Sequence, residues 1–192
     1  MTRCVVLLLV LQQCAAAVEL HIRFEALERM LTEQVFSQEG RRYVRGSKMA
    51  KCNFAYLEKP QVRGDAGRLR IQAHFTGRSA LNLAGQCVGV GDAFDLVITA
   101  VPVYHSGSLG LQEVSVSSAG KSGYYIRRVC EAMQGSLGKD FKYPLEAAAQ
   151  QLMEAPQVHP GFQREIRKFT VPDIRVSNDS LVLQLDFELT VK

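Results

Sequence analysis

Residues 181–192 read Leu-Val-Leu-Gln-Leu-Asp-Phe-Glu-Leu-Thr-Val-Lys, and this alternating stretch decides the fold class. Its odd positions, from Leu181 to Val191, are all apolar, whereas its even positions after Val182 are all polar. Successive side chains of a strand point to opposite faces, so the stretch predicts a strand with one buried face. Strands of this kind are typical of antiparallel sheets whose other face meets solvent.

The same alternation recurs upstream and predicts an antiparallel sheet of several strands. Residues 105–108 and 177–180 are rich in Ser, Gly, Asn and Asp, which predicts hairpin turns at both places. A change of register near Gln112 or Glu113 predicts a β-bulge. Residues 41–49 are expected to form an edge strand or a loop. The other expected strands lie near residues 18–24, 52–57, 69–75, 94–100, 109–116, 169–176 and 181–192.

Two segments change from strand to helical spacing. Residues 25–35 predict a short N-terminal helix that ends before Gly40, and residues 123–154 predict a long C-terminal helix. Pro144 is expected at the first turn of the second half of that helix or at a kink within it. No alternation of strand and helix occurs that would favour a parallel sheet. The expected fold is therefore α+β, with a strongly curved antiparallel sheet wrapped around the long C-terminal helix.

Glycine-rich sequence interrupts the middle of the expected sheet. Gly85, Gly89 and Gly91 predict a looser stretch between two of the strands. The run Gly89-Val90-Gly91-Asp92 lacks the third glycine and the following helix of a dinucleotide-binding loop, so it is interpreted as a turn.

The first 17 residues have the composition of a secretory signal peptide. Arg3 lies in a short basic start, an apolar run follows, and small residues precede the expected cleavage site after Ala17. The apolar run is shorter than the ~20 residues that a membrane-spanning helix needs. Residues 18–192 are then expected to form a single exported domain, periplasmic or secreted. Lipoprotein anchoring at Cys14 is not favoured, because Gln13 is not the small residue that normally precedes the modified cysteine.

Three cysteines would remain after cleavage: Cys52, Cys87 and Cys130. An exported chain usually pairs its cysteines, so an odd number leaves at least one free. Cys52 and Cys87 both lie in the expected sheet and are candidates for a pair, whereas Cys130 falls on the apolar face of a predicted helix. No CxxC spacing occurs, so neither a zinc site nor a thioredoxin-like site is indicated.

The distribution of charge and the lack of catalytic motifs exclude several classes of function. The formal net charge is +4, and the basic residues are scattered and do not form the stripe with interleaved aromatics that nucleic acids require. Weak peripheral attraction to anionic lipid headgroups is compatible with this charge. No Gly-x-Ser-x-Gly motif occurs, and the four histidines share no ligand spacing. We expect no catalytic residues, no metal and no cofactor. A hydrolase that uses one of the three cysteines with a histidine is the disfavoured alternative.

Apolar side chains are the main positive feature of the chain. They line one face of at least five expected strands, and the two expected helices carry matching stripes. Such rows ordinarily form a core, but a sheet and helix that do not close completely leave apolar surface for a ligand, a membrane or a protein. The residues expected to line such a groove are Leu27, Leu31, Ile71, Phe75, Phe94, Ile98, Ile126, Met133, Leu185 and Phe187.

The order of these segments resembles the single-module tubular lipid-binding (TULIP-type) proteins, above all the small bacterial exported YceB-like group. The resemblance rests on residues 18–36, on 94–116 with Ala100-Val101-Pro102-Val103, and on 124–153. It implies a curved sheet around a long helix, an apolar channel, and non-catalytic binding of a lipid through a diffuse apolar lining. The chain departs from the group in its three cysteines, in lacking a convincing lipobox and in two closing strands after Pro172. The alternative function is a protein-interaction or structural module of the cell envelope that uses the same groove.

Overall fold

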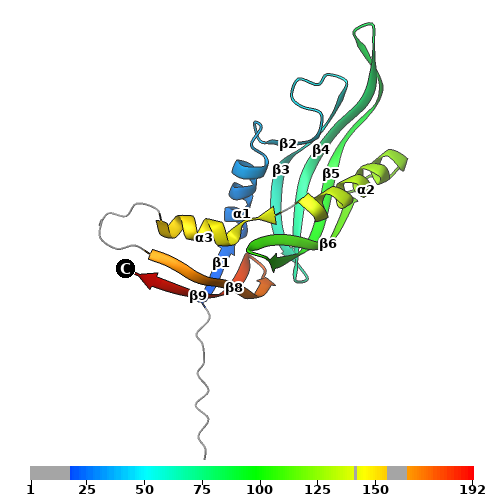
Figure 1. Ribbon diagram of the computed structural model, residues 1–192. Coiled ribbons are helices and arrows are strands. Elements are labelled where there is room, and N and C mark those ends of the chain that lie inside the picture. The colour runs from blue at the N-terminus through cyan, green and yellow to red at the C-terminus, as the bar shows by residue number, and fades with distance from the viewer. Residues whose placement is uncertain (1–17, 141, 155–163) are drawn as a thin grey trace, which may run out of the picture.

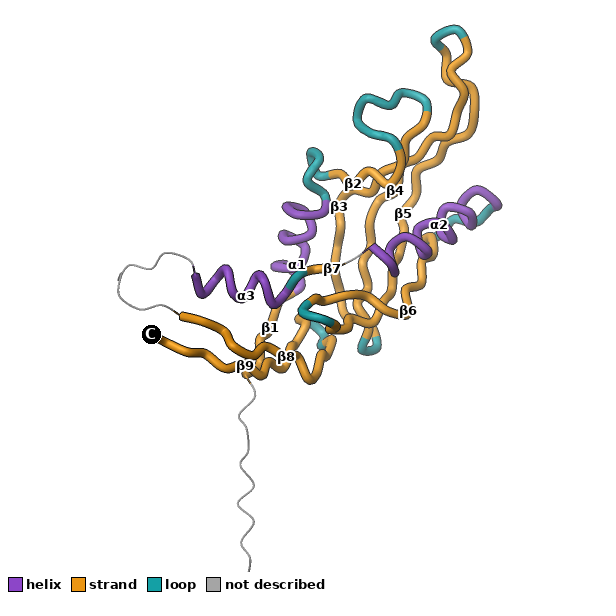
Figure 2. The backbone as a smooth tube through the Cα atoms, viewed as in Figure 1, coloured by secondary structure: helices purple, strands orange, loops and turns teal. Residues whose placement is uncertain are grey.

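The computed structural model describes residues 18–140, 142–154 and 164–192, which form two antiparallel sheets and short helices (Figure 1, Figure 2). The larger sheet contains, in spatial order, β2 (Arg41–Arg45), β3 (Asn53–Asp65), β4 (Arg68–Leu83), β5 (Gln86–His105), β6 (Ser108–Ser118) and β7 (Lys142–Tyr143). The smaller sheet contains β1 (Val18–Arg23), β9 (Ser180–Val191) and β8 (Arg164–Val176) in that order. The larger sheet is strongly curled into a half-barrel, so the predicted α+β class and curved antiparallel sheet are confirmed.

β4 and β5 form the longest hairpin of the larger sheet. They pair without a break from Leu69 opposite Ala100 to Leu83 opposite Gln86. The stretch around Gly85 was expected to be looser, and this expectation is wrong because both strands continue to a tight turn. Ala84 and Gly85 make that turn with φ values of 51° and 85°, a left-handed conformation that suits a two-residue hairpin loop.

β6 carries the predicted bulge. The pairing of β5 with β6 shifts between Thr99 and Val101, so that two residues of β6 lie opposite the single residue Ala100. Glu113 adopts φ 48° at this point. A bulge of this kind bends the strand and re-aims the neighbouring side chains. The sequence therefore located the irregularity correctly.

The long C-terminal helix predicted over residues 123–154 is wrong. The structure has two helices in its place, α2 (Tyr124–Asp140) and α3 (Leu145–Glu154), with β7 between them. Pro144 directly precedes α3, and its carbonyl accepts the first helical hydrogen bond from Ala148 at 3.0 Å. Proline has no amide hydrogen and restricts the residue before it to extended backbone, which explains the strand at β7 and the new helix start.

The N-terminal strand and helix follow the prediction closely. β1 ends at Arg23, and α1 (Phe24–Met30) begins at once and continues as a π-helical turn, η1 (Leu31–Val35). The amide of Phe24 donates to the carbonyl of Asp179 at 3.0 Å, which fixes the start of α1 against the β8–β9 turn. None of the described helices has the length and hydropathy needed to cross a membrane.

Side chains from the helices and both sheets form three adjoining apolar clusters. The largest joins the half-barrel to α2 through Phe75, Phe94, Ile126 and Met133. A second surrounds Phe24 of α1, and a third surrounds Leu181 and Leu183 of β9, which are fully buried. Half-buried hydrophobic residues connect the first cluster to the second: Leu31, Ile71 and Val114.

Gly64 marks the point where the two sheets meet. A methyl group at this position would lie well inside van der Waals contact with the carbonyl oxygen of Ser177, and close to Val176 and Phe24. The turn of the smaller sheet can therefore approach β3 only because residue 64 has no side chain.

The Gly64→Ala variant tests this close approach. Overpacking should lower the free energy of unfolding by about 2 kcal/mol, as measured by urea denaturation. Gly135→Ala is the matched control, because a methyl group there meets no atom within 4 Å and alanine favours a helix. Equal stabilities for the two variants would contradict the proposed contact.

The Cys52–Cys87 pair considered in the sequence forms a disulfide, with the Cα atoms 5.3 Å apart and a sequence separation of 35. It ties the segment before β3 to β5. Reduction should cost about 2–4 kcal/mol of stability, because the bond removes conformational freedom from the unfolded chain. Thermal unfolding with and without dithiothreitol measures this cost. An unchanged melting temperature after complete reduction would show that the bond does not constrain folding.

Candidate functional site

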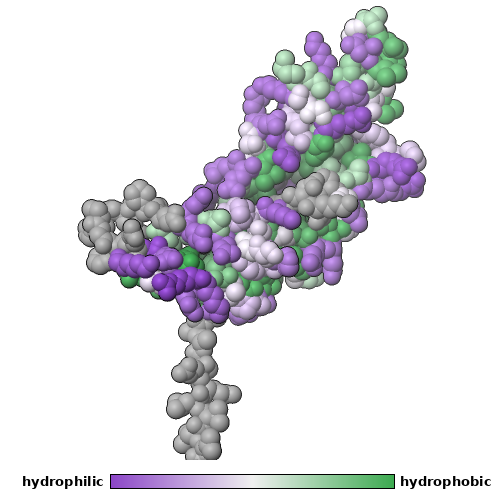
Figure 3. Space-filling model, viewed as in Figure 1, coloured by the Kyte–Doolittle hydropathy of each residue, from purple (hydrophilic) through white to green (hydrophobic). Residues whose placement is uncertain are grey.

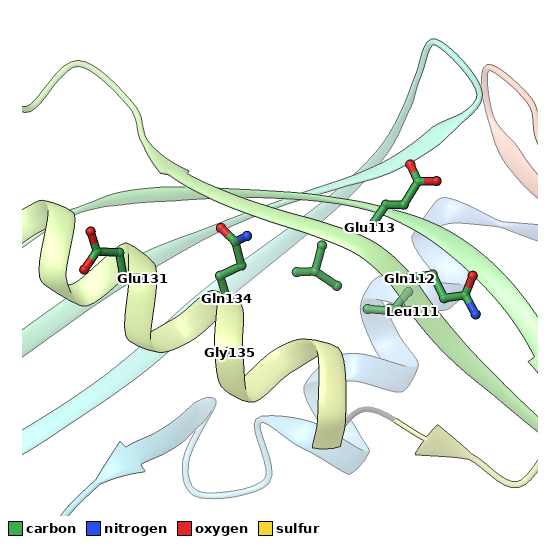
Figure 4. A pocket seen from close by; sticks show the side chains of 7 residues that line it. Leu111, Gln112, Glu113, Glu131, Gln134 and Gly135 are labelled. Atoms are coloured by element: carbon green, nitrogen blue, oxygen red, sulfur yellow. The ribbon is translucent and has the colours of Figure 1, made fainter.

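A depression of about 720 Å³ lies between β6 and α2 and is open to solvent (Figure 4). Four consecutive residues of β6 form one side, and three residues of α2 form the other. The lining residues are Leu111, Gln112, Glu113, Val114, Glu131, Gln134 and Gly135. Two of the β6 residues, Glu113 and Val114, form the bulge, so the depression lies where β6 is bent.

An arginine of β4 holds the bulge in place. The guanidinium of Arg68 donates to the Glu113 side chain at 2.7 Å and to the Glu113 carbonyl oxygen at 2.6 Å. This two-point contact fixes a residue whose backbone is in the left-handed region. Leu111 is buried beneath the bulge and Val114 is half-buried, so the floor of the depression is apolar.

The α2 side of the depression combines a small residue with polar ones. Gly135 has open space where a side chain would begin, so the helix does not pack tightly against β6 at this level. Glu131 is paired with Arg128 at 3.0 Å and lies 4.0 Å from Arg127. The rim thus carries two carboxylates, of Glu113 and Glu131, and each already has an arginine partner.

The structure brings eight of the ten predicted lining residues together on the helix-bearing side of the half-barrel. Five of them pack against one another in the largest cluster and are buried: Phe75, Phe94, Ile98, Ile126 and Met133. Leu27, Leu31 and Ile71 are half-buried and lie beside the second cluster. The remaining two lie in the smaller sheet, where Leu185 packs against the third cluster and Phe187 pairs across the strands with Phe169.

Sequence reasoning missed the residues that line the depression. Leu111 and Val114 were expected only as part of the strand near residues 109–116, and Gly135 only as part of the helix over residues 123–154. The predicted register shift at Gln112 or Glu113 was the one feature that pointed to this place, since bulges often lie beside functional sites. The predicted lining residues belong to the apolar rows that the strands bury in the core. The accessible apolar surface lies at the bulge, where such a row is interrupted.

Ionisable side chains elsewhere form ion pairs, and one of them contains a histidine in the middle of the larger sheet. His74 and Asp95 are neighbours across β4 and β5, with His74 Nδ1 2.8 Å from Asp95 Oδ1. Both lie on the face of the sheet opposite Phe75, because adjacent positions of a strand point to opposite sides. Among the described residues, no group of three or more His, Cys, Asp or Glu side chains could hold a metal ion.

The sequence was also compared with known proteins. No protein-family model matches the chain, and no curated protein matches it significantly.

Cys130 is a half-buried free thiol of α2 that packs against the largest cluster. Burial raises the pKa of this thiol, because the charged thiolate is poorly solvated there. Less thiolate is present at a given pH, so Cys130 should react with iodoacetamide several times more slowly than glutathione at pH 8. Intact-mass spectrometry over time measures the rate. A reaction as fast as that of glutathione would show that the thiol is not shielded.

Proposed function

We propose that the protein binds a lipid or another apolar ligand without catalysing a reaction, in an exported compartment. The observation that carries this proposal is the row of half-buried side chains Leu31, Ile71 and Val114 between two core clusters. Val114 also lines the depression between β6 and α2. Apolar surface therefore continues from the core to a place that a ligand can reach.

The chemistry of the depression suits an amphiphile. Its floor is formed by Leu111 and Val114, whereas its rim carries amide and carboxylate groups. An acyl chain would lie on the floor, and its polar head would meet the rim. Because Arg68 and Arg128 each pair with a rim carboxylate, the rim does not present two uncompensated negative charges to the ligand.

The size of the depression supports the same class of ligand. Its volume of about 720 Å³ falls within the roughly 300–1,000 Å³ of typical small-molecule sites. Each buried acyl methylene contributes about 0.8 kcal/mol, so a short hydrocarbon segment is enough for useful affinity. The ligand would lie along the open groove, with part of its surface in contact with water.

The compartment is proposed from two features. The Cys52–Cys87 disulfide favours an oxidising environment, as found in the periplasm or outside the cell. The signal-like segment of residues 1–17 gives the same expectation, although it lies outside the described residues. A TULIP-type, YceB-like relationship remains part of this proposal, supported by the curled antiparallel sheet alone, since the described residues lack the long helix that the resemblance implies.

The alternative is that a protein segment occupies the same groove, as part of a structural or interaction module. The openness of the depression favours this alternative, because a peptide side chain can enter from the solvent side. A competition experiment distinguishes the lipid ligand from the protein ligand. A protein partner that co-purifies in equal amounts and that fatty acid displaces would support the protein-interaction function.

Gly135→Leu tests the ligand site directly. The new side chain should fill the depression, because nothing lies within 4 Å of its first atom. We expect at least a tenfold loss of affinity for a fluorescent fatty acid, together with an unchanged or higher melting temperature because leucine favours a helix. Ala132→Leu on an exposed position of α2 is the matched control and should bind normally.

Two results would contradict the proposal. One is wild-type protein that binds neither fatty acids nor phospholipids and shows only the polypeptide mass after gentle extraction from its host. The other is a Gly135→Leu variant that binds as tightly as the Ala132→Leu control.

A further inference from the structure

The distal part of the β4–β5 hairpin projects beyond α2 (Figure 1) and carries bare aliphatic side chains. Leu81 and Leu83 of β4 are 70% and 55% exposed, and Val88 and Val90 of β5 are 56% and 61% exposed. We call these four residues the tip patch. Figure 3 shows hydrophobic side chains gathered at this end of the molecule.

The pairing of the two strands places the whole patch on one face. Leu81 lies opposite Val88, and the positions two residues away on each strand share the same side of the sheet. The buried Phe75 lies on this side too, six residues before Leu81. The tip patch therefore continues the core face of the half-barrel past the end of its helical cover.

The other face of the hairpin is covered by the chain at one place, around Ala80. The Cys52–Cys87 disulfide draws the segment before β3 across Ala80 to β5. The Asn53 side chain bonds to the amide and the carbonyl of Ala80 at the edge of β4. Ala80 is buried as a result. The rest of that face carries exposed polar and glycine residues, including Arg78 and Asn82. Among the described residues of the distal hairpin, the exposed large aliphatic side chains therefore all lie on the face of the tip patch.

Positive charge gathers at the same end of the molecule. Residues 41–53 contain five basic residues and no acidic residue, and residues 76–91 contain Arg78 and no acidic residue. Within the described part of the chain, Arg45, Lys51 and Arg78 form no ion pair with a carboxylate. The bare apolar patch is therefore accompanied by uncompensated positive charge.

The start of α2 adds an aromatic side chain beside the hairpin. Lys121 donates to Asp92 at 2.8 Å, which lowers the pKa of that carboxyl and fixes the residues before α2 against β5. Tyr124 follows and is 68% exposed, with the guanidinium of Arg128 5.6 Å from the centre of its ring. Tyrosine is enriched at the boundary between membrane and water, where its ring and hydroxyl meet both environments.

We infer that the tip patch inserts into the surface of an anionic lipid bilayer, with Arg45, Lys51 and Arg78 at the level of the headgroups. The aliphatic side chains gain by leaving water, and each basic residue near the surface adds attraction to anionic lipid. The inference goes beyond the proposed ligand site and does not rest on it. It identifies the end of the molecule that meets the membrane, whether or not the depression holds a lipid.

A second copy of the chain fits this patch less well. Stable dimers bury about 800 Å² on each partner, well above what four aliphatic side chains supply. A bilayer surface does not require so large a matched area.

Flotation with lipid vesicles tests the inference. The exported protein, with its N-terminus determined by intact mass, should float with vesicles of phosphatidylcholine and phosphatidylglycerol. The Leu81→Gln/Val88→Gln variant should lose about tenfold or more in partitioning, because two aliphatic side chains that would enter the bilayer are replaced by polar ones. Leu152→Gln is the matched control, since Leu152 is 74% exposed on α3, and it should partition as the wild type does.

The charge requirement is tested separately. Lys51→Glu/Arg78→Glu should reduce partitioning about tenfold or more, and added salt should weaken binding of the wild type. Vesicles of phosphatidylcholine alone should retain less protein than anionic vesicles. Equal retention on both vesicles, with no effect of the charge reversals, would overturn the role given to the basic residues.

The absence of tryptophan from the sequence allows a local probe. The emission of Val88→Trp should shift to shorter wavelength with anionic vesicles, whereas that of Leu152→Trp should not. The inference is overturned if the wild type stays unbound, if Leu81→Gln/Val88→Gln floats normally, or if only Leu152→Trp shifts. A dimer in solution that Leu81→Gln/Val88→Gln dissociates would assign the patch to self-association and would also overturn it.

Discussion

The long pairing of β4 with β5 is the constraint on which the structure depends. It runs unbroken from Leu69 opposite Ala100 to Leu83 opposite Gln86, so a single register decides which side chains share a face over the entire hairpin. One face carries Phe75 and the core beneath α2. A slip of one residue would exchange the two faces and expose that core, so burial and register enforce each other. The same register carries the apolar face outward to the tip, where no helix of the described chain covers it.

The helices cover the core face of the larger sheet incompletely, and both the proposed ligand site and the proposed membrane contact lie where this cover is missing. At the β6 end, the bulge at Glu113 and the missing side chain of Gly135 leave a depression beside α2. At the hairpin end, α2 begins beside Asp92 and the strands continue past it. The tip patch follows from the length of the hairpin relative to α2, whereas the depression follows from local features of β6 and α2.

The elements that depend on local chemistry were predictable from the sequence. Alternation identified the strands, Ser and Gly at residues 105–108 identified a turn, and the register shift identified the bulge. Pro144 was expected at the first turn of the second half of the helix or at a kink, but the strand before it was not expected. The pairing of β7 with β6 is a tertiary contact that no local pattern reveals. The candidate site was harder for the same reason. Apolar rows show which side chains turn inward, whereas accessible apolar surface depends on where a helix stops or stands away from the sheet.

The central claim is that an apolar ligand reaches the protein at the partly covered boundary between β6 and α2. Photo-crosslinking with a diazirine fatty acid, followed by peptide mass spectrometry, tests it most directly. The account predicts labels within residues 109–118 and 124–140, near Val114 and Gly135, and their loss when excess unlabelled fatty acid is present. Labels confined to other parts of the chain, or labels that the competitor does not displace, would contradict it.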